Sequence, residues 1–322
     1  MQQTKVILCR TGDYNPGREL VQALEREFPE VHFIDLPKGE FEQRKEEVKD
    51  AQVFVGWPDE NQLNALPELR WIQLPSAGAN GYTQRSALAE HVIVTNSSGV
   101  FGVAGAEHAI ALMLAFTRQL HVHYDQQRRK IWKRNPYCLE VQDSTVGIIG
   151  LGDIGGGIAQ RAKGLGARVI AVKRTVTACP PFVDRLYALE DVDSLLAEAD
   201  FLVLALPLTA ETQGFLNAER IGRIKKGAVL INVGRGPTVD ESALIRALQN
   251  GDISGAGLDV TDVEPLPQIS PLWELPNVLI TSHSVGVTPR KEERRVSILR
   301  QNLRRFLSGE EMMNRVDRTA GY

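Results

Sequence analysis

The chain has 322 residues, of which 43% are hydrophobic and 24% are charged, and its formal net charge at pH 7 is −3. This composition is typical of a globular protein, and the length is sufficient for two domains with separate cores. The small negative charge gives no reason to expect a nucleic-acid partner. We also expect no membrane segment, because no apolar stretch reaches the length of a span and the N-terminal residues lack the apolar part of a signal peptide.

Three cysteines, Cys9, Cys138 and Cys179, are spread along the chain without a C-x-x-C spacing. This spacing favours free thiols in a reducing compartment, and we therefore expect a cytoplasmic protein. We expect no metal site, because the sequence has no H-E-x-x-H motif or comparable set of ligands.

The first hundred residues alternate between apolar runs that predict strands and amphipathic patterns that predict helices, such as Arg18–Phe28. The predicted strands are Lys5–Cys9, Val31–Leu36, Ala51–Gly56, Arg70–Leu74 and Val92–Thr95. Alternation of this kind implies a parallel sheet that is covered by helices on both faces.

A long and largely apolar helix is predicted over Val103–His121. It has too many apolar residues for a surface helix. We expect it to pack between domains or between subunits.

A second series of strands begins after Ser144. The predicted strands are Thr145–Ile149, Arg168–Val172, Phe201–Ala205, Val229–Val233, Gly255–Asp259 and Val278–Thr281. Thr238 and Glu241 have the spacing of a capping box at the start of a helix over Glu241–Asn250, which Gly251 should end. Six strands separated by helices are expected to form a doubly wound sheet. A long amphipathic helix, Pro289–Leu307, follows.

The segment V-G-I-I-G-L-G-D-I-G over Val146–Gly155 is the most informative motif. An apolar strand leads into Gly150, Gly152 and Gly155 in the spacing G-x-G-x-x-G, and a helical pattern follows. In this context the motif is the dinucleotide-binding fingerprint, in which a helix N-terminus faces the pyrophosphate.

Three polar residues follow predicted strands of the second series, at the edge of an open α/β sheet where ligands bind. Arg235 stands between two glycines, which favours a guanidinium presented to a carboxylate over an ordinary surface arginine. Glu264 alone would be interpreted as a solvated loop residue. His283 alone could be a structural histidine, but its position suits a general acid–base, and a nearby carboxylate would favour its imidazolium form.

A loop of small residues, Ser76–Asn80, follows one of the strands in the first series. Successive backbone N–H groups in such a loop can bind an anion. An ordinary connection into a helix explains the same residues equally well.

Five motifs in chain order resemble the D-isomer-specific 2-hydroxyacid dehydrogenase family. They are G-L-G-D-I-G at 150–155, L-P-L-T-A-E-T at 206–212, I-N-V-G-R-G at 231–236, G-L-D-V-T-D-V-E-P-L-P at 257–267 and N-V-L-I-T-S-H at 277–283. The resemblance implies an α/β fold in which a Rossmann-type, doubly wound parallel-sheet cofactor domain (99–287) is inserted into a smaller flavodoxin-like substrate domain (1–98 and 288–322). It also implies a homodimer with the helix near 103–121 in the interface.

By the same resemblance the catalytic residues are Arg235, Glu264 and His283. Arg235 binds the carboxylate and carbonyl of a small 2-oxo or 2-hydroxy acid, His283 is the acid–base, and Glu264 pairs with it. Substrate contacts are expected from Ala77, Gly78, Ala79, Arg235 and His283. Cofactor contacts are expected from Gly150, Gly152, Asp153, Ile154, Gly155, Lys173, Arg174, Thr175, Leu206, Pro207, Thr212, Val233, Gly234, Arg235, Asp259, His283 and Gly286, with Asp259 holding the nicotinamide carboxamide. The family usually has proline before the catalytic histidine, where this chain has Ser282.

The cofactor preference follows from the end of the second cofactor-domain strand. An NAD enzyme carries an acidic residue there for the ribose hydroxyls. This chain has Lys173, Arg174 and Thr175 instead, which suit a 2′-phosphate. We therefore expect NADP to be preferred, as in the glyoxylate/hydroxypyruvate reductase branch, although exposed cations would also permit NAD.

A dehydrogenase-like corepressor that binds NAD(P) and protein partners is the alternative function. The sequence does not rank glyoxylate, hydroxypyruvate, pyruvate or a branched 2-oxo acid as the substrate.

Overall fold

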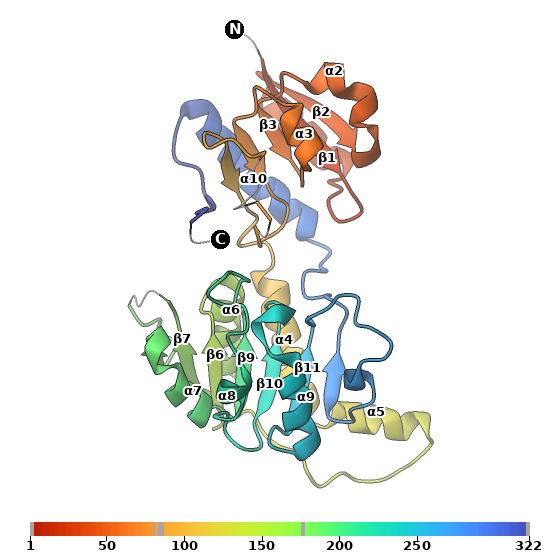
Figure 1. The fold of residues 1–322 in the computed structure, drawn as a ribbon, viewed down its shortest axis with the longest axis vertical. Coiled ribbons are helices and arrows are strands. Elements are labelled where there is room, and N and C mark those ends of the chain that lie inside the picture. The colour runs from red at the N-terminus through yellow and green to blue at the C-terminus, as the bar shows by residue number, and fades with distance from the viewer. Residues whose placement is uncertain (1–2, 80, 83–86, 175–177, 320–322) are drawn as a thin grey trace. The chain divides into compact units, whose positions relative to one another are not determined.

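The computed structural model describes residues 3–79, 81–82, 87–174 and 178–319. The chain divides into two units, which are described separately below. Unit 1 comprises residues 1–100 and 288–322, and unit 2 comprises residues 101–287. Each unit is built on one parallel sheet, of five strands in unit 1 and seven in unit 2 (Figure 1).

Unit 1 has the strand order β2-β1-β3-β4-β5, which is the flavodoxin-like order. Its strands are β1 (Thr4–Arg10), β2 (Val31–Pro37), β3 (Val53–Val55), β4 (Trp71–Gln73) and β5 (Ile93–Thr95). Its helices are α1 (Arg18–Glu27), α2 (Lys45–Val48), α3 (Glu60–Asn64) and α10 (Lys291–Ser308). The five strands predicted from the sequence are all present, with ends that differ by no more than two residues.

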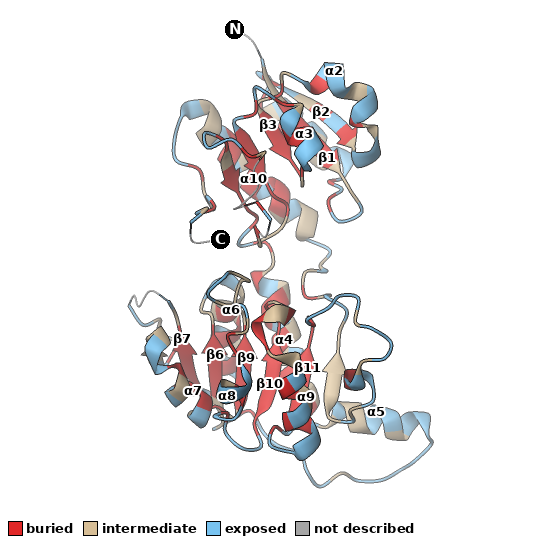
Figure 2. Ribbon diagram, in the orientation of Figure 1, coloured by how far each residue is buried: buried red, intermediate tan, exposed pale blue. Residues whose placement is uncertain are grey.

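Both faces of this sheet are covered. Val6 and Leu8 pack with residues of α1 and α10, whereas Ile7 and Cys9 pack with residues of α2 and α3. Successive residues of β1 therefore face opposite apolar layers, which is why its central part is continuously apolar rather than alternating. The buried strands and the exposed outer sides of the helices are seen in Figure 2.

Unit 2 has the strand order β12-β11-β10-β9-β6-β7-β8, a doubly wound Rossmann order with one further strand. Its strands are β6 (Thr145–Ile149), β7 (Arg168–Val172), β8 (Arg185–Tyr187), β9 (Phe201–Leu204), β10 (Val229–Asn232), β11 (Gly255–Leu258) and β12 (Val278–Ile280). Its helices are α4 (Gly102–Thr117), α5 (Leu120–Arg128), α6 (Asp153–Gly164), α7 (Val192–Glu198), α8 (Ala218–Ile221) and α9 (Glu241–Asn250). The predicted α/β fold class is confirmed.

Three local predictions were wrong. Strand β8 was not predicted, because three residues that include an exposed arginine give too short a pattern. The long apolar helix is two helices, α4 and α5, since Gln119 between them has a left-handed backbone (φ 54°). The buried side of α4 packs within unit 2, against α6 and the sheet.

The third wrong prediction is the capping box at Thr238. The N-cap of α9 is Asp240, whose carboxylate accepts a hydrogen bond from the N–H of Ala243 at 2.9 Å. The Thr238 hydroxyl instead donates to the carbonyl of Arg235 at 2.6 Å. The predicted end of this helix is confirmed, because Gly251 is its left-handed C-cap.

Two neighbouring glycines in α6 allow the effect of close packing on stability to be measured separately from the effect of helix propensity. A Cβ on Gly155 would lie 1.9 Å from the carbonyl oxygen of Gly150, whereas a Cβ on Gly156 would have nothing within 4 Å. Gly155→Ala should therefore lower the free energy of unfolding by about 2 kcal/mol or more. The matched control Gly156→Ala should be neutral or stabilise by up to ~1 kcal/mol. Urea denaturation followed by circular dichroism measures both, and equal losses would exclude close packing as the cause.

Candidate active site

The glycine motif connects β6 to α6 and leaves space before the helix. Gly150 has φ 98°, and a Cβ on it would lie 2.7 Å from the carbonyl oxygen of Ala205. Gly152 is the N-cap of α6, and because it has no side chain the first N–H groups of the helix receive no side-chain cap from it. A Cβ on Gly152 would have no heavy atom within 4 Å. The positive end of this twelve-residue helix thus begins at a position around which the described residues leave space. These residues fit the pyrophosphate of a dinucleotide.

Two other residues of the motif pack against α4. The carboxylate of Asp153 lies against Gly102, where a Cβ would come within 2.1 Å of it, and the side chain of Ile154 lies against Gly105. Among the residues predicted to contact the cofactor, Asp153 and Ile154 therefore direct their side chains to the helix pair α4–α6. Their remaining groups for a ligand are backbone N–H groups at the start of α6.

The ends of β9 and β10 lie backbone to backbone. A Cβ on Gly234 would lie 2.8 Å from the carbonyl oxygen of Leu206. Val233 is buried, and the hydroxyl of Thr212 donates to the carbonyl of Pro207 at 2.6 Å. The structure thus brings these five predicted cofactor residues to the ends of adjacent strands, and the Thr212 hydroxyl closes its own loop.

The end of β7 carries cations and no carboxylate in its described residues. Lys173 is half-buried and Arg174 is exposed, with its guanidinium 3.8 Å from the carboxylate of Glu211. Thr175, which completes the predicted 2′-phosphate site, lies outside the described residues.

Arg235 stands in a tight connection after β10. A Cβ on Gly236 would lie 1.8 Å from the carbonyl oxygen of Thr261, so only glycine allows this approach to the segment that follows β11. The side chain of Asn232 accepts from the N–H of Gly234 at 3.0 Å. Together with the Thr238 hydroxyl, this contact fixes the turn on both sides of Arg235.

The guanidinium of Arg235 is partly withdrawn from solvent. Burial lowers its pKa below the ordinary value, and the nearby Glu264 carboxylate opposes that shift. Its Nη1 donates to the carbonyl of Gly234 at 2.7 Å. No carboxylate of the described residues lies within 4.0 Å of it. A guanidinium in this position remains charged and gains by pairing with an anion.

His283 and Glu264 form a hydrogen-bonded pair. Nδ1 of His283 lies 2.7 Å from Oε2 of Glu264, and Oε1 of Glu264 accepts from the N–H of Thr261 at 3.2 Å. An ionised carboxylate only accepts hydrogen bonds, so Nδ1 carries the hydrogen and Nε2 is left for another partner. This is the arrangement of an imidazole that exchanges a proton with a substrate.

Asp259 holds the turn that carries His283. Its side chain is 0% exposed, Oδ1 accepts from the N–H of Ser284 at 2.8 Å and Oδ2 accepts from the N–H of Val285 at 3.0 Å. Its carbonyl oxygen accepts from the N–H of His283 at 2.8 Å. His283 itself has a left-handed backbone (φ 49°), a conformation that a non-glycine residue keeps only where its surroundings hold it. Gly286 follows and lies against the ring of Phe101.

The small-residue loop belongs to unit 1. The Ser76 hydroxyl donates to the carbonyl of Gly78 at 2.7 Å and accepts from Trp57 Nε1 at 3.2 Å. The N–H groups of Ala77, Gly78 and Ala79 have no acceptor among the described residues. Free consecutive N–H groups are suited to an anion. This loop belongs to unit 1, whereas Arg235, Glu264 and His283 belong to unit 2.

Sequence reasoning missed four residues that support the site: Asn232, Thr238, Thr281 and His108. Each acts through the backbone or through another side chain. Asn232 and Thr281 lie within the recognised motifs I-N-V-G-R-G and N-V-L-I-T-S-H, where a polar residue in or directly after an apolar strand was an available signal.

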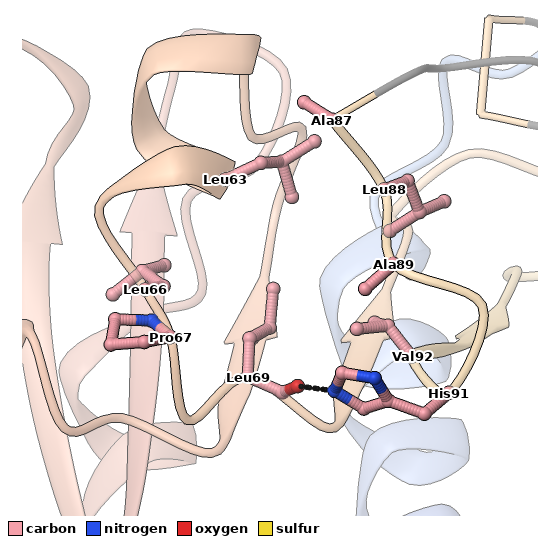
Figure 3. Close-up of a pocket in the computed structure, with 9 residues that line it drawn as sticks. All are labelled: Leu63, Leu66, Pro67, Leu69, Ala87, Leu88, Ala89, His91 and Val92. Atoms are coloured by element: carbon pink, nitrogen blue, oxygen red, sulfur yellow. Dashed lines mark hydrogen bonds between the residues drawn. The ribbon is translucent and has the colours of Figure 1, made fainter.

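A small apolar cavity in unit 1 is not a substrate site. It measures about 50 Å³ and is lined by Leu63 of α3, by the segment between α3 and β4 and by the segment before β5, with His91 Nε2 3.3 Å from the carbonyl of Leu69 (Figure 3). Ligand pockets are usually several hundred Å³. None of the predicted site residues lines it.

Within the described ranges, no helix is long and apolar enough to cross a membrane. The same residues contain no group of three or more histidine, cysteine or acidic side chains that could hold a metal ion. Cys9, Cys138 and Cys179 are free. The cytoplasmic location stays a prediction.

A Rossmann sheet with a glycine motif and a histidine–carboxylate pair at strand ends defines a nucleotide-dependent oxidoreductase. Comparison with known proteins gives the family. Residues 110–285 match the family model "D-isomer specific 2-hydroxyacid dehydrogenase, NAD binding domain". The chain therefore belongs to the D-isomer specific 2-hydroxyacid dehydrogenase family and is an NAD(P)-dependent enzyme of that family.

Individual relatives agree with this assignment. Glyoxylate/hydroxypyruvate reductase B of Serratia proteamaculans is 34% identical over 85% of this chain and 86% of that protein. A D-isomer specific 2-hydroxyacid dehydrogenase of Xanthobacter autotrophicus Py2, solved with NADPH and MES, is 30% identical with a TM-score of 0.85 over 100% of both chains. The NADPH-dependent glyoxylate/hydroxypyruvate reductase of Sinorhizobium meliloti, solved with NADP and sulfate, is 27% identical with a TM-score of 0.85 over 99% of this chain and 100% of that chain.

Proposed function

We propose that this enzyme reduces small 2-oxo acids to D-2-hydroxy acids with NADPH, and catalyses the reverse reaction, with His283 as the acid–base. The observation that carries the proposal is the 2.7 Å contact between His283 and Glu264, at the strand edge that also bears the glycine motif. The names of the Serratia and Sinorhizobium relatives support the substrate class.

The residues divide the reaction between them. A nicotinamide bound at the strand edge would supply or accept the hydride. His283 delivers a proton from Nε2 to the keto oxygen, and Glu264 holds Nδ1 and so orients the imidazole ring. Arg235 binds the substrate carboxylate and carbonyl with its planar guanidinium. The substrate-binding role of Ala77, Gly78 and Ala79 is part of this proposal and is supported by their N–H groups, which have no acceptor among the described residues.

Substitution of the two site residues tests the assignment. His283→Ala and Arg235→Ala should each lower kcat/KM for 2-oxo acid reduction by about 100-fold or more, because one removes proton transfer and the other removes carboxylate binding. NADPH affinity, measured by fluorescence titration, should fall by less than about tenfold, because both residues are expected cofactor contacts but the pyrophosphate site is intact.

The matched controls are His32→Ala on β2 and Arg246→Ala on α9, both exposed. They should keep full activity. A panel of glyoxylate, hydroxypyruvate, pyruvate and a branched 2-oxo acid identifies the substrate, with chiral analysis of the product. Tight NADPH binding by the unmodified protein without turnover of any 2-oxo acid would favour the corepressor alternative.

We also propose that NADP is preferred over NAD. The described end of β7 lacks the carboxylate that NAD enzymes use for the ribose, and it carries Lys173 and Arg174. The two solved relatives named above contained NADPH or NADP, which supports this preference.

Removal of the cations tests the cofactor preference. Arg174→Ala and Lys173→Ala should each raise KM for NADPH by about tenfold and leave KM for NADH within about twofold, because only NADPH carries the 2′-phosphate. The control is Arg168→Ala, a cation at the opposite end of β7. An unmodified enzyme with a higher kcat/KM for NADH would contradict the proposal.

We further propose a homodimer whose interface includes α5 and the segment after it. This part extends away from the sheet of unit 2 and is largely exposed (Figures 1 and 2). Its exposed apolar side chains are Leu120, Tyr124, Ile131, Trp132, Tyr137 and Leu139. Apolar side chains gathered on one exposed segment are typical of a protein–protein contact.

Charge introduced into this segment should separate the subunits. Trp132→Glu replaces a fully exposed aromatic ring, and light scattering after size exclusion should show half the mass of the unmodified protein, because a contact centre does not tolerate an unpaired charge. Ile269→Glu, at a 93% exposed position elsewhere in unit 2, is the control and should keep the dimer. A monomeric unmodified protein would exclude the proposal.

A further inference from the structure

His108 of α4 reaches the Asp259 carboxylate through Thr281. Nε2 of His108 lies 2.9 Å from the hydroxyl oxygen of Thr281. That hydroxyl lies 2.6 Å from Oδ1 of Asp259. His108 Nε2 is also 3.5 Å from the same carboxylate oxygen. Three side chains from α4, the end of β11 and the end of β12 therefore form one polar chain.

The direction of the hydrogen bonds in this chain follows from donor counting. The buried Asp259 carboxylate, which accepts two backbone N–H groups, is an acceptor only. The single hydroxyl hydrogen of Thr281 must then point to Asp259. The oxygen of Thr281 can only accept from His108, so Nε2 of His108 carries a hydrogen. The hydrogen bonds are therefore donated from His108 to Thr281 and from Thr281 to Asp259.

The chain ends on the turn that carries His283. Oδ1 of Asp259 receives the Thr281 hydroxyl and the N–H of Ser284, which fills the usual capacity of a carboxylate oxygen. The Thr281 hydroxyl thereby fixes the rotation of the carboxylate about its Cβ–Cγ bond. Only in the right rotation can Oδ1 accept from the N–H of Ser284 while Oδ2 accepts from the N–H of Val285.

We propose that Thr281 and His108 are positioning residues for the acid–base His283, acting through the carboxylate of Asp259. The inference rests on the proposed function, because it assumes that His283 is the group to be placed. It also gives Asp259 a role within the protein: its carboxylate holds the left-handed turn at His283, and only Oδ2 keeps capacity for a further donor.

The pair Thr281→Val and Thr281→Ser tests the hydroxyl. Valine keeps the branched shape and removes the donor, and serine keeps the donor. Thr281→Val should speed hydrogen exchange at the N–H groups of Ser284 and Val285 by about tenfold in the cofactor-free protein, measured by NMR, because the carboxylate is no longer fixed. Its kcat should fall about tenfold while KM for NADPH stays within about twofold. Thr281→Ser should restore both readouts.

His108→Leu and His108→Gln test the first member of the chain. Leucine removes the donor and leaves the Thr281–Asp259 bond in place, so a smaller effect in the same direction is expected, about threefold in exchange and in kcat. The glutamine amide can donate from the position of Nε2, so His108→Gln should restore the exchange rate and kcat. These variants also serve if Thr281→Val does not fold.

Each outcome decides the inference. Faster exchange and lower kcat in the valine and leucine variants, with rescue by serine and glutamine, would support it. Equal behaviour within each pair would overturn it, and so would a loss of thermal stability without change in exchange or kcat, which indicates packing only. An active His283→Ala enzyme would instead refute the proposed function, while the exchange measurement would still report on the turn.

Discussion

The backbone contact between Gly236 and Thr261 is the constraint on which the site depends. The carbonyl oxygen of Thr261 lies where a side chain at residue 236 would stand. The connection after β10 can therefore lie directly on the segment after β11. Arg235 comes from the first and Glu264 from the second, so one interatomic approach sets the distance between a cation and a carboxylate. A parallel sheet makes this possible because neighbouring strands end at the same edge.

Two partly or fully buried charges lie near this contact and are satisfied differently. The Asp259 carboxylate is surrounded by donors, and it accepts two backbone N–H groups and a hydroxyl. The Arg235 guanidinium has only the carbonyl of Gly234 at hydrogen-bonding distance among the described residues. A buried anion with its donors in place stiffens the protein, whereas a partly desolvated cation with no carboxylate at hydrogen-bonding distance favours a negatively charged ligand. The first charge is satisfied within the protein, and the second is left able to pair with an anion.

The sequence was sufficient for most of the strands and helices, although β8 and the break between α4 and α5 were not predicted. Strand–helix alternation predicted both sheets, and the glycine spacing predicted the β6–α6 turn, because these patterns are local. The sequence did not predict which hydrogen-bond partner an individual side chain would take. The Thr238 hydroxyl bonds the carbonyl of Arg235 rather than an N–H of α9, and Asp240, two residues later, caps that helix. His108 and Thr281 are 173 residues apart, and only the packing of α4 on the sheet brings them together.

The glycines of the β6–α6 motif are unequal in one respect. Gly150 and Gly155 are required by the folded chain itself, since a side chain on either would meet a backbone oxygen. Gly152 has an ordinary backbone conformation and open space around it, so the polypeptide would tolerate many residues there. Natural selection for folding alone can therefore retain the first and last glycine but not the middle one. A lineage that stopped binding a dinucleotide would be free to lose Gly152 first, which makes this position a marker of retained binding within the family.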